Sequence, residues 1–160
     1  MSQVRGILFI KIYQVFEKRY MPIIQVAKNK LGMIAGNGKF PIIFAQSAKK
    51  QTGVQLIAIG ILGDTSRKLS KFVDKIYWIQ AGQYNRLIEI LEEEQISRLA
   101  MVGQINPKKL FDKRIVVDEE LQQMLETIRN KKADTIFGAV SNKLERKGIE
   151  IINSTTYMKE

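Results

Sequence analysis

The residues best suited to chemistry form a glycine-rich run at positions 36–41, with the sequence Gly-Asn-Gly-Lys-Phe-Pro. Gly36 and Gly38 permit a tight turn, and Pro41 is typical of the first turn of a helix. The backbone N–H groups of such a turn, together with the positive end of the helix dipole, bind phosphate. We therefore predict an anion site at this turn. The alternative is a turn that only connects a strand to a helix.

Two common nucleotide-binding motifs do not fit this run. A dinucleotide fingerprint would place a third glycine at position 41 and an acidic residue about 20 positions later to bind the ribose. Position 41 is proline, and no Asp or Glu occurs between Arg19 and Gly63. A P-loop is also excluded, because no Gly-Lys-Ser/Thr follows at the required spacing. The sequence thus argues against a nicotinamide cofactor.

The other chemistry-bearing residues are carboxylates, because the chain has no Cys and no His. Thiol nucleophiles, zinc thiolates and histidine bases are excluded. Acidic residues in predicted loops are candidate magnesium ligands, but acids in loops also cap helices, and Asp118 and Asp134 each precede a helical segment. No paired-carboxylate arrangement stands out, so the metal ligands stay unknown. The loop acids are Asp64, Asp74, Asp112 and Asp118.

The elements that must position these residues alternate between short apolar runs and helical periodicity from Lys30 onward, which is typical of an α/β domain. We predict a single Rossmann-like domain over residues 30–152, with a parallel sheet and helices on both faces. A basic loop is expected at 106–114. The expected strands are 31–35, 54–61, 75–79, 99–102 and 150–152, and the expected helices are 41–52, 67–72, 83–94, 118–130 and 134–147.

Composition supports a globular protein, with 45% hydrophobic and 26% charged residues. The apolar runs are far shorter than the roughly 20 residues that span a bilayer, and no signal peptide is evident, so we expect a cytoplasmic protein. The net charge is +10, and residues 1–63 hold nine Lys/Arg against one Glu. That region is suited to phosphates, nucleic acid or an anionic membrane surface, or is simply a solvated basic face.

Residues 1–29 do not follow the strand-helix rhythm. Val4, Leu8, Ile12, Val15 and Phe16 would share one face of a basic amphipathic helix. We favour the alternative, in which this segment is an extension outside the fold.

The run 30–41 resembles the opening of the UDP-2,3-diacylglucosamine pyrophosphatases of lipid A synthesis, the two-domain type unrelated to the metallophosphoesterases. The resemblance spans residues 30–160, in order and at similar spacing. It departs at Gln104, where many relatives have Lys, and at Phe137-Gly138, where a Leu/Arg-rich helix is usual. The matching segments are Trp78-Ile79, Gly82-Gln83, Met101 to Ile105, Leu144 to Glu150, and Ser154 to Tyr157.

This resemblance implies a Rossmann-like N-terminal domain that holds a UDP-linked diacylglucosamine lipid against a second, C-terminal domain. It also implies magnesium-dependent attack of water on the α-phosphorus, which releases UMP and 2,3-diacylglucosamine 1-phosphate. The implied substrate-binding residues are Gly36, Asn37, Gly38, Lys39, Phe40, Gln83, Gly103 and Gln104.

The family's catalytic aspartate belongs to the second domain, which we expect to begin just after Glu160, with residues 153–160 starting the linker. The resemblance therefore predicts a substrate-binding half that is inactive alone, with the C-terminal domain and an anionic inner-membrane surface as partners. A nucleotide or nucleotide-sugar binding module without catalysis is the alternative function. We predict no nucleic-acid partner, because no recognisable nucleic-acid module accompanies the charge; a homodimer stays open.

Overall fold

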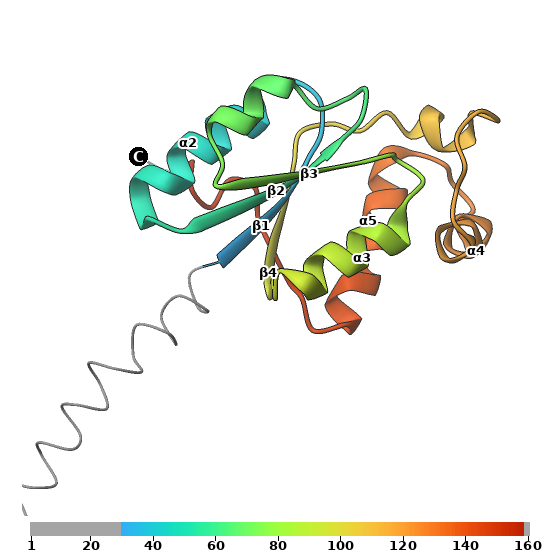
Figure 1. Cartoon of the computed structure of the whole chain (residues 1–160). Helices are drawn as coiled ribbons and strands as arrows, with labels where there is room; N and C mark the ends of the chain where they lie inside the picture. Colours follow the sequence, from blue (N-terminus) through green and yellow to red (C-terminus); the bar gives the residue numbers. More distant parts are fainter. Residues whose placement is uncertain (1–29, 159–160) are drawn as a thin grey trace, which may run out of the picture.

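The computed structural model describes residues 30–158, which fold into a sheet of five parallel strands covered by helices (Figure 1). The predicted extension, residues 1–29, lies outside this range. The strands are β1 (Lys30–Ala35), β2 (Gln55–Ile61), β3 (Lys75–Ile79), β4 (Arg98–Val102) and β5 (Glu150–Ile152). The helices are α2 (Phe40–Thr52), α3 (Tyr84–Glu93), α4 (Glu119–Thr127) and α5 (Ala133–Arg146), with 3₁₀ helices η1 (Arg67–Lys71) and η2 (Pro107–Phe111).

The strand order is β3-β2-β1-β4-β5, and all four pairings are parallel. The chain therefore builds outward from β1 in one direction and then crosses to β4 on its other side. At such a reversal the loops after the two neighbouring strands diverge, and ligands of open α/β sheets bind there. The predicted α/β fold, a single Rossmann-like domain, is confirmed.

Alternation along β1 divides the core into two layers. Leu31 and Met33 lie on the face that α2 covers, where they pack in one cluster with Phe44. Ile34 lies on the opposite face, in a cluster with Leu87 of α3 and residues of α5. Figure 1 shows α2 on one side of the sheet and α3 with α5 on the other. Burial on both faces explains why the strands have continuous apolar sequences.

The predicted basic loop at 106–114 contains a turn of 3₁₀ helix that the sequence analysis did not predict. Asn106 precedes it, and its side-chain oxygen accepts a hydrogen bond from the Lys108 amide at 3.0 Å. Pro107 takes the first helical position, where no N–H is needed. An Asn-Pro pair is a recognisable helix start. The sequence analysis predicted a loop instead, because the segment is rich in basic residues.

The segment after β5 packs on the domain as far as it is described. Tyr157 is buried, and its ring lies edge-on to Phe44 at 5.7 Å between centroids. Its carbonyl accepts a hydrogen bond from the Gln51 side chain at 2.8 Å. Part of the predicted linker start therefore covers α2.

Candidate functional site

The ends of β1 and β4 are joined by backbone hydrogen bonds beyond the sheet. The Gly36 amide donates to the Val102 carbonyl at 2.7 Å, and the Asn37 amide donates to the Gln104 carbonyl at 2.6 Å. Asn37 and Gln104 thus form an isolated antiparallel bridge. Four predicted site residues (Gly36, Asn37, Gly103 and Gln104) come together here.

Both glycines of this bridge are required by close packing. A Cβ on Gly36 would lie 2.4 Å from the Gln104 carbonyl oxygen, and one on Gly103 would lie 2.8 Å from the Asn37 carbonyl oxygen. Gly103 also has a φ of +89°, a conformation that disfavours side chains. The bridge is therefore a fixed feature of the fold.

Gly38, Lys39 and Phe40 form the open part of the turn. Gly38 has a φ of +94°, and no atom of the described residues lies within 4 Å of the position that a Cβ would take. Lys39 precedes α2 without a side-chain cap, and the first turn of α2 contains no acid. Within residues 30–158, the amides of Gly38, Lys39 and Phe40 have no acceptor. Unpaired amides at a helix start, beside a lysine, suit an anion.

Gln83, the remaining predicted residue, lies apart from this bridge at the start of α3. Its side-chain oxygen accepts a hydrogen bond from the Gln80 amide at 2.8 Å. Gln83 also lines a cavity of about 70 Å³ between the sheet and the helices α3, α4 and α5. The structure therefore divides the predicted residues between an anion-suited turn and the wall of a cavity.

The cavity is apolar and adjoins the bridge along the chain. Ile34 precedes Gly36 by two residues, and Ile105 directly follows Gln104. Sequence reasoning missed the cavity, because its apolar lining comes from many elements and each residue resembles ordinary core. The lining comprises Ile34, Ile61, Ile79, Ala81, Gln83, Tyr84, Leu87, Met101, Ile105, Pro107, Leu110, Leu121, Ala133, Ile136, Phe137 and Val140.

The candidate magnesium ligands are already engaged. Asp64 is paired with Lys109 Nζ at 2.5 Å, and Asp74 with Lys49 at 2.7 Å. The Arg114 guanidinium holds Asp112 and lowers the pKa of that carboxyl to about 2. Asp118 caps α4, as predicted, by accepting from the Leu121 amide at 3.0 Å. The same prediction is wrong for Asp134, which lies within the first turn of α5, because Lys132 takes the cap position there without a side-chain hydrogen bond.

No group of three acidic side chains within residues 30–158 is arranged to hold a metal ion. Asp64, Asp74 and Asp112 are each paired with a cation, and Asp118 caps a helix.

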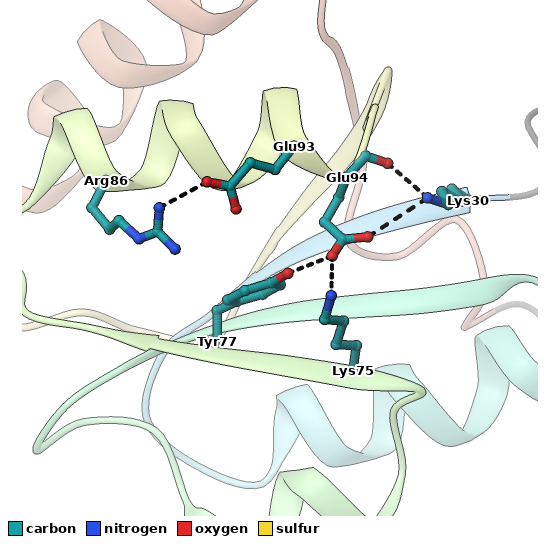
Figure 2. A network of polar contacts seen from close by, with 6 residues as sticks. All are labelled: Lys30, Lys75, Tyr77, Arg86, Glu93 and Glu94. Carbon is teal, nitrogen blue, oxygen red and sulfur yellow. Dashed lines mark hydrogen bonds and ion pairs between the residues drawn. The ribbon is translucent and has the colours of Figure 1, made fainter.

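The opposite edge of the sheet carries a denser polar network (Figure 2). Glu94, at the end of α3, accepts hydrogen bonds from Lys75 and from the Tyr77 hydroxyl. Its second carboxylate oxygen lies 3.6 Å from Lys30 Nζ, which also donates to the Glu94 carbonyl at 2.9 Å. The hydrogen bonds from Lys75 and Tyr77 lower the pKa of Glu94. Every charge here has a partner, so the network stabilises the fold and offers no reactive group.

A comparison with protein families matches residues 30–160 to the profile of the LpxI N-terminal domain. The chain belongs to this family. No curated protein matches it. LpxI takes part in hydrolysis of a lipid A precursor, in agreement with the predicted resemblance.

The matched range agrees with the packing of the LpxI N-terminal domain in this chain. It begins at Lys30, where β1 begins, and it includes the buried Tyr157. The two positions at which we expect a departure from the family pattern lie at the site. Gln104 takes part in the bridge through its backbone, and Phe137 lines the cavity. None of the helices described in residues 30–158 is long and apolar enough to cross a membrane.

Proposed function

We propose that this LpxI N-terminal domain is the substrate-binding half of a UDP-2,3-diacylglucosamine hydrolase, and that the turn at 36–40 binds the UDP end of the lipid. The observation that carries the proposal is the start of α2. Three amides without acceptors, and Lys39 beside them, lie where β1 and β4 diverge. A diphosphate is the part of this substrate that such a group of donors suits.

The open space at Gly38 is the second support. Because no atom in the described part of the chain lies within 4 Å of its Cβ position, a phosphate oxygen can approach the backbone there. The bridge between Asn37 and Gln104 fixes the start of the turn, where the turn leaves β1. We propose that Gly36, Asn37, Gly103 and Gln104 position the turn, and that Gly38, Lys39 and Phe40 contact the diphosphate.

We propose that this chain binds the lipid and does not cleave it. Hydrolysis at the α-phosphorus needs groups that activate water and stabilise the developing charge, held together in one geometry. The loop aspartates described here are committed to Lys109, Lys49, Arg114 and a helix cap. In this proposal the catalytic aspartate and the magnesium ligands belong to the C-terminal domain of the family. The anionic inner-membrane surface remains a predicted partner, carried by the basic residues of 1–63.

Titration with UMP and with a UDP-sugar, followed by calorimetry, tests the turn. Gly38→Val is expected to abolish binding, because the branched side chain occupies the space that the phosphate needs. Gly53→Val is the matched control: Gly53 also has a positive φ and open space at its Cβ, at the other end of α2. Both variants carry similar backbone strain, so only Gly38→Val should lose the ligand. Unchanged affinity in a folded Gly38→Val variant would contradict the proposal.

A further inference from the structure

Tyr84 combines deep burial with a hydroxyl that nothing satisfies. The residue is 3% exposed, and its hydroxyl oxygen is buried without a hydrogen-bond partner among residues 30–158. Buried polar atoms without partners are rare in folded proteins, and each one calls for an explanation. Tyr84 lines the apolar cavity, which offers such an explanation: the missing partner is a group that enters the cavity.

The surroundings of Tyr84 keep this hydroxyl neutral. Burial, with further contributions from Glu120 and Asp118, raises the pKa of Tyr84 to about 12. Lys143 lies over the ring, 5.4 Å from its centroid, but its ammonium is paired with Glu120 at 2.7 Å. At physiological pH the hydroxyl is therefore available as a donor to a carbonyl or hydroxyl oxygen.

The rest of the lining restricts the ligand further. Among residues 30–158, no Asp, Glu, Lys or Arg lines the cavity, and Gln83 is the one amide side chain on its wall. A phosphate or carboxylate would be buried there without a counter-charge, which is strongly unfavourable. An alkyl chain that carries one polar oxygen matches both the apolar wall and the single hydroxyl.

We propose that the cavity binds an acyl chain of a lipid and that the Tyr84 hydroxyl hydrogen-bonds to a carbonyl or hydroxyl oxygen on that chain. The inference rests on the proposed function in one respect, namely that the chain belongs to the lipid whose diphosphate lies at the turn. Ile34 and Ile105 support this arrangement, because they line the cavity within three residues of the bridge. An amphiphile with its head at the turn would place its tail here.

The outer wall indicates where such a chain enters. Ile105, Pro107 and Leu110 come from the segment between β4 and α4, which contains one short 3₁₀ helix. The segment is held across the sheet edge by Lys109, whose ammonium contacts the Asp64 carboxylate and the Gly63 carbonyl. The cavity is smaller than the ~150 Å³ that takes benzene in an engineered protein. A long chain must therefore displace this segment, and short probes suit a first test.

Methyl-detected NMR of the full chain tests the proposal with methyl hexanoate and with hexane. Methyl hexanoate carries an ester carbonyl and hexane has no polar atom. We expect both to shift the methyl signals of Ile136 and Val140, which line the cavity, and to leave Ile43, which is exposed on α2, unchanged. Absence of shifts at Ile136 and Val140 with both probes would overturn the proposal.

Tyr84→Phe then isolates the hydroxyl. The variant should bind methyl hexanoate about three- to tenfold more weakly than the natural chain, the range of one hydrogen bond, and should bind hexane equally well or better. Equal losses for both probes would show that the ring and not the hydroxyl matters, and would overturn the hydrogen bond. Thermal unfolding confirms that the variant is folded, and Ala133→Leu, which narrows the cavity, should weaken both probes.

The outcome is separable from that of the proposed function, because neither probe contains a nucleotide. Gly38→Val is expected to bind methyl hexanoate normally. Ester binding in a chain that binds no UMP would contradict the proposed diphosphate site and would leave the cavity as an acyl site. UMP binding with no ester binding would overturn the acyl site alone.

Discussion

The two edges of the sheet differ in whether their polar groups have hydrogen-bond partners. At the edge where β1 and β3 begin, Glu94 satisfies two lysines and a tyrosine, as Figure 2 shows. At the edge where β1 and β4 end, the amides at 38–40, one oxygen of Asp64 and the Tyr84 hydroxyl all lack partners within residues 30–158. The amides of Gly38 and Lys39 are exposed, whereas the Asp64 oxygen and the Tyr84 hydroxyl are buried, where polar groups are normally paired. The difference separates the edge that Glu94 stabilises from the edge where we propose that the ligand binds.

The largest expected effect concerns catalysis at the edge of the sheet where β1 and β4 end, which we call the unpaired edge. With magnesium and UDP-2,3-diacylglucosamine, the 160-residue chain should release no UMP above background, and addition of the family's C-terminal domain, fused or in trans, should restore turnover. The physical reason is that binding at one half of a site does not place a water-activating group at the phosphorus. A coupled assay for UMP provides the measurement. Robust hydrolysis by the chain alone would return Asp64, Asp112 and Asp118 to consideration as catalytic residues.

The largest effect on stability is expected at the edge of the sheet where β1 and β3 begin, which we call the paired edge. Glu94→Ala leaves Lys30, Lys75 and the Tyr77 hydroxyl without their acceptor, and should lower the free energy of unfolding by about 2–4 kcal/mol in urea titrations. Glu93→Ala is the matched control on the same helix. Its side chain is 53% exposed and, among the residues that the structure describes, pairs only with Arg86, so its removal should cost about 0.5 kcal/mol or less.

The pH dependence of stability provides a check on that result. The pKa of folded Glu94 is lowered from its ordinary value of 4.5, so the folded state gains stability from this carboxylate above that value. As the pH falls from 4.5 through the folded pKa, the unfolded chain binds the proton more readily and this stability is lost. Glu94→Gln should flatten the acid limb of the stability profile. An unchanged limb would show that the network contributes little.

A smaller effect on stability is expected from the ion pair between Lys109 and Asp64, which holds the segment between β4 and α4 against the sheet. Lys109→Met removes the ammonium that contacts the buried Asp64, and should lower the free energy of unfolding by about 1–2 kcal/mol, because a buried carboxylate then lacks its counter-charge. Lys108→Met, on the exposed neighbour, should have almost no effect. Methyl signals of Ile105 and Leu110 should broaden in Lys109→Met as the segment loosens. A cost as large as that of Glu94→Ala would remove the contrast between the edges.

The features that could be predicted from the sequence are those that depend on local signals. The strands, α2 and the turn at 36–41 follow from local signals, namely apolar runs, paired glycines and a proline at a helix start, and the structure places them within a few residues of the predicted bounds. The parallel sheet with helices on both faces follows from the alternation of buried strands and helices, whereas the strand order was not predicted, because the right-handed connection rule does not fix where the order reverses. These features depend on neighbours in the chain.

The cavity and the Glu94 network could not be predicted, because they depend on contacts between distant positions. Glu94 meets Lys30 across 64 residues, and Tyr84 shares its cavity with Ile136 and Val140 of α5. In the sequence Tyr84 is one of several apolar positions on an amphipathic helix. Only the fold shows that its hydroxyl is buried and unpaired.

The smallest expected effect lies outside both edges. The family match and β1 both begin at Lys30, and residues 1–29, which we predict to be an extension that adds no strand to the sheet, lie outside the described residues. Deletion of residues 1–20 should therefore leave the midpoint of thermal unfolding almost unchanged. If those residues packed on the core, their loss would cost about 1 kcal/mol or more and would lower the midpoint by about 2–8 °C. Lys30 itself must be retained, because its ammonium contacts Glu94, and a deletion that included it would report on the paired edge instead.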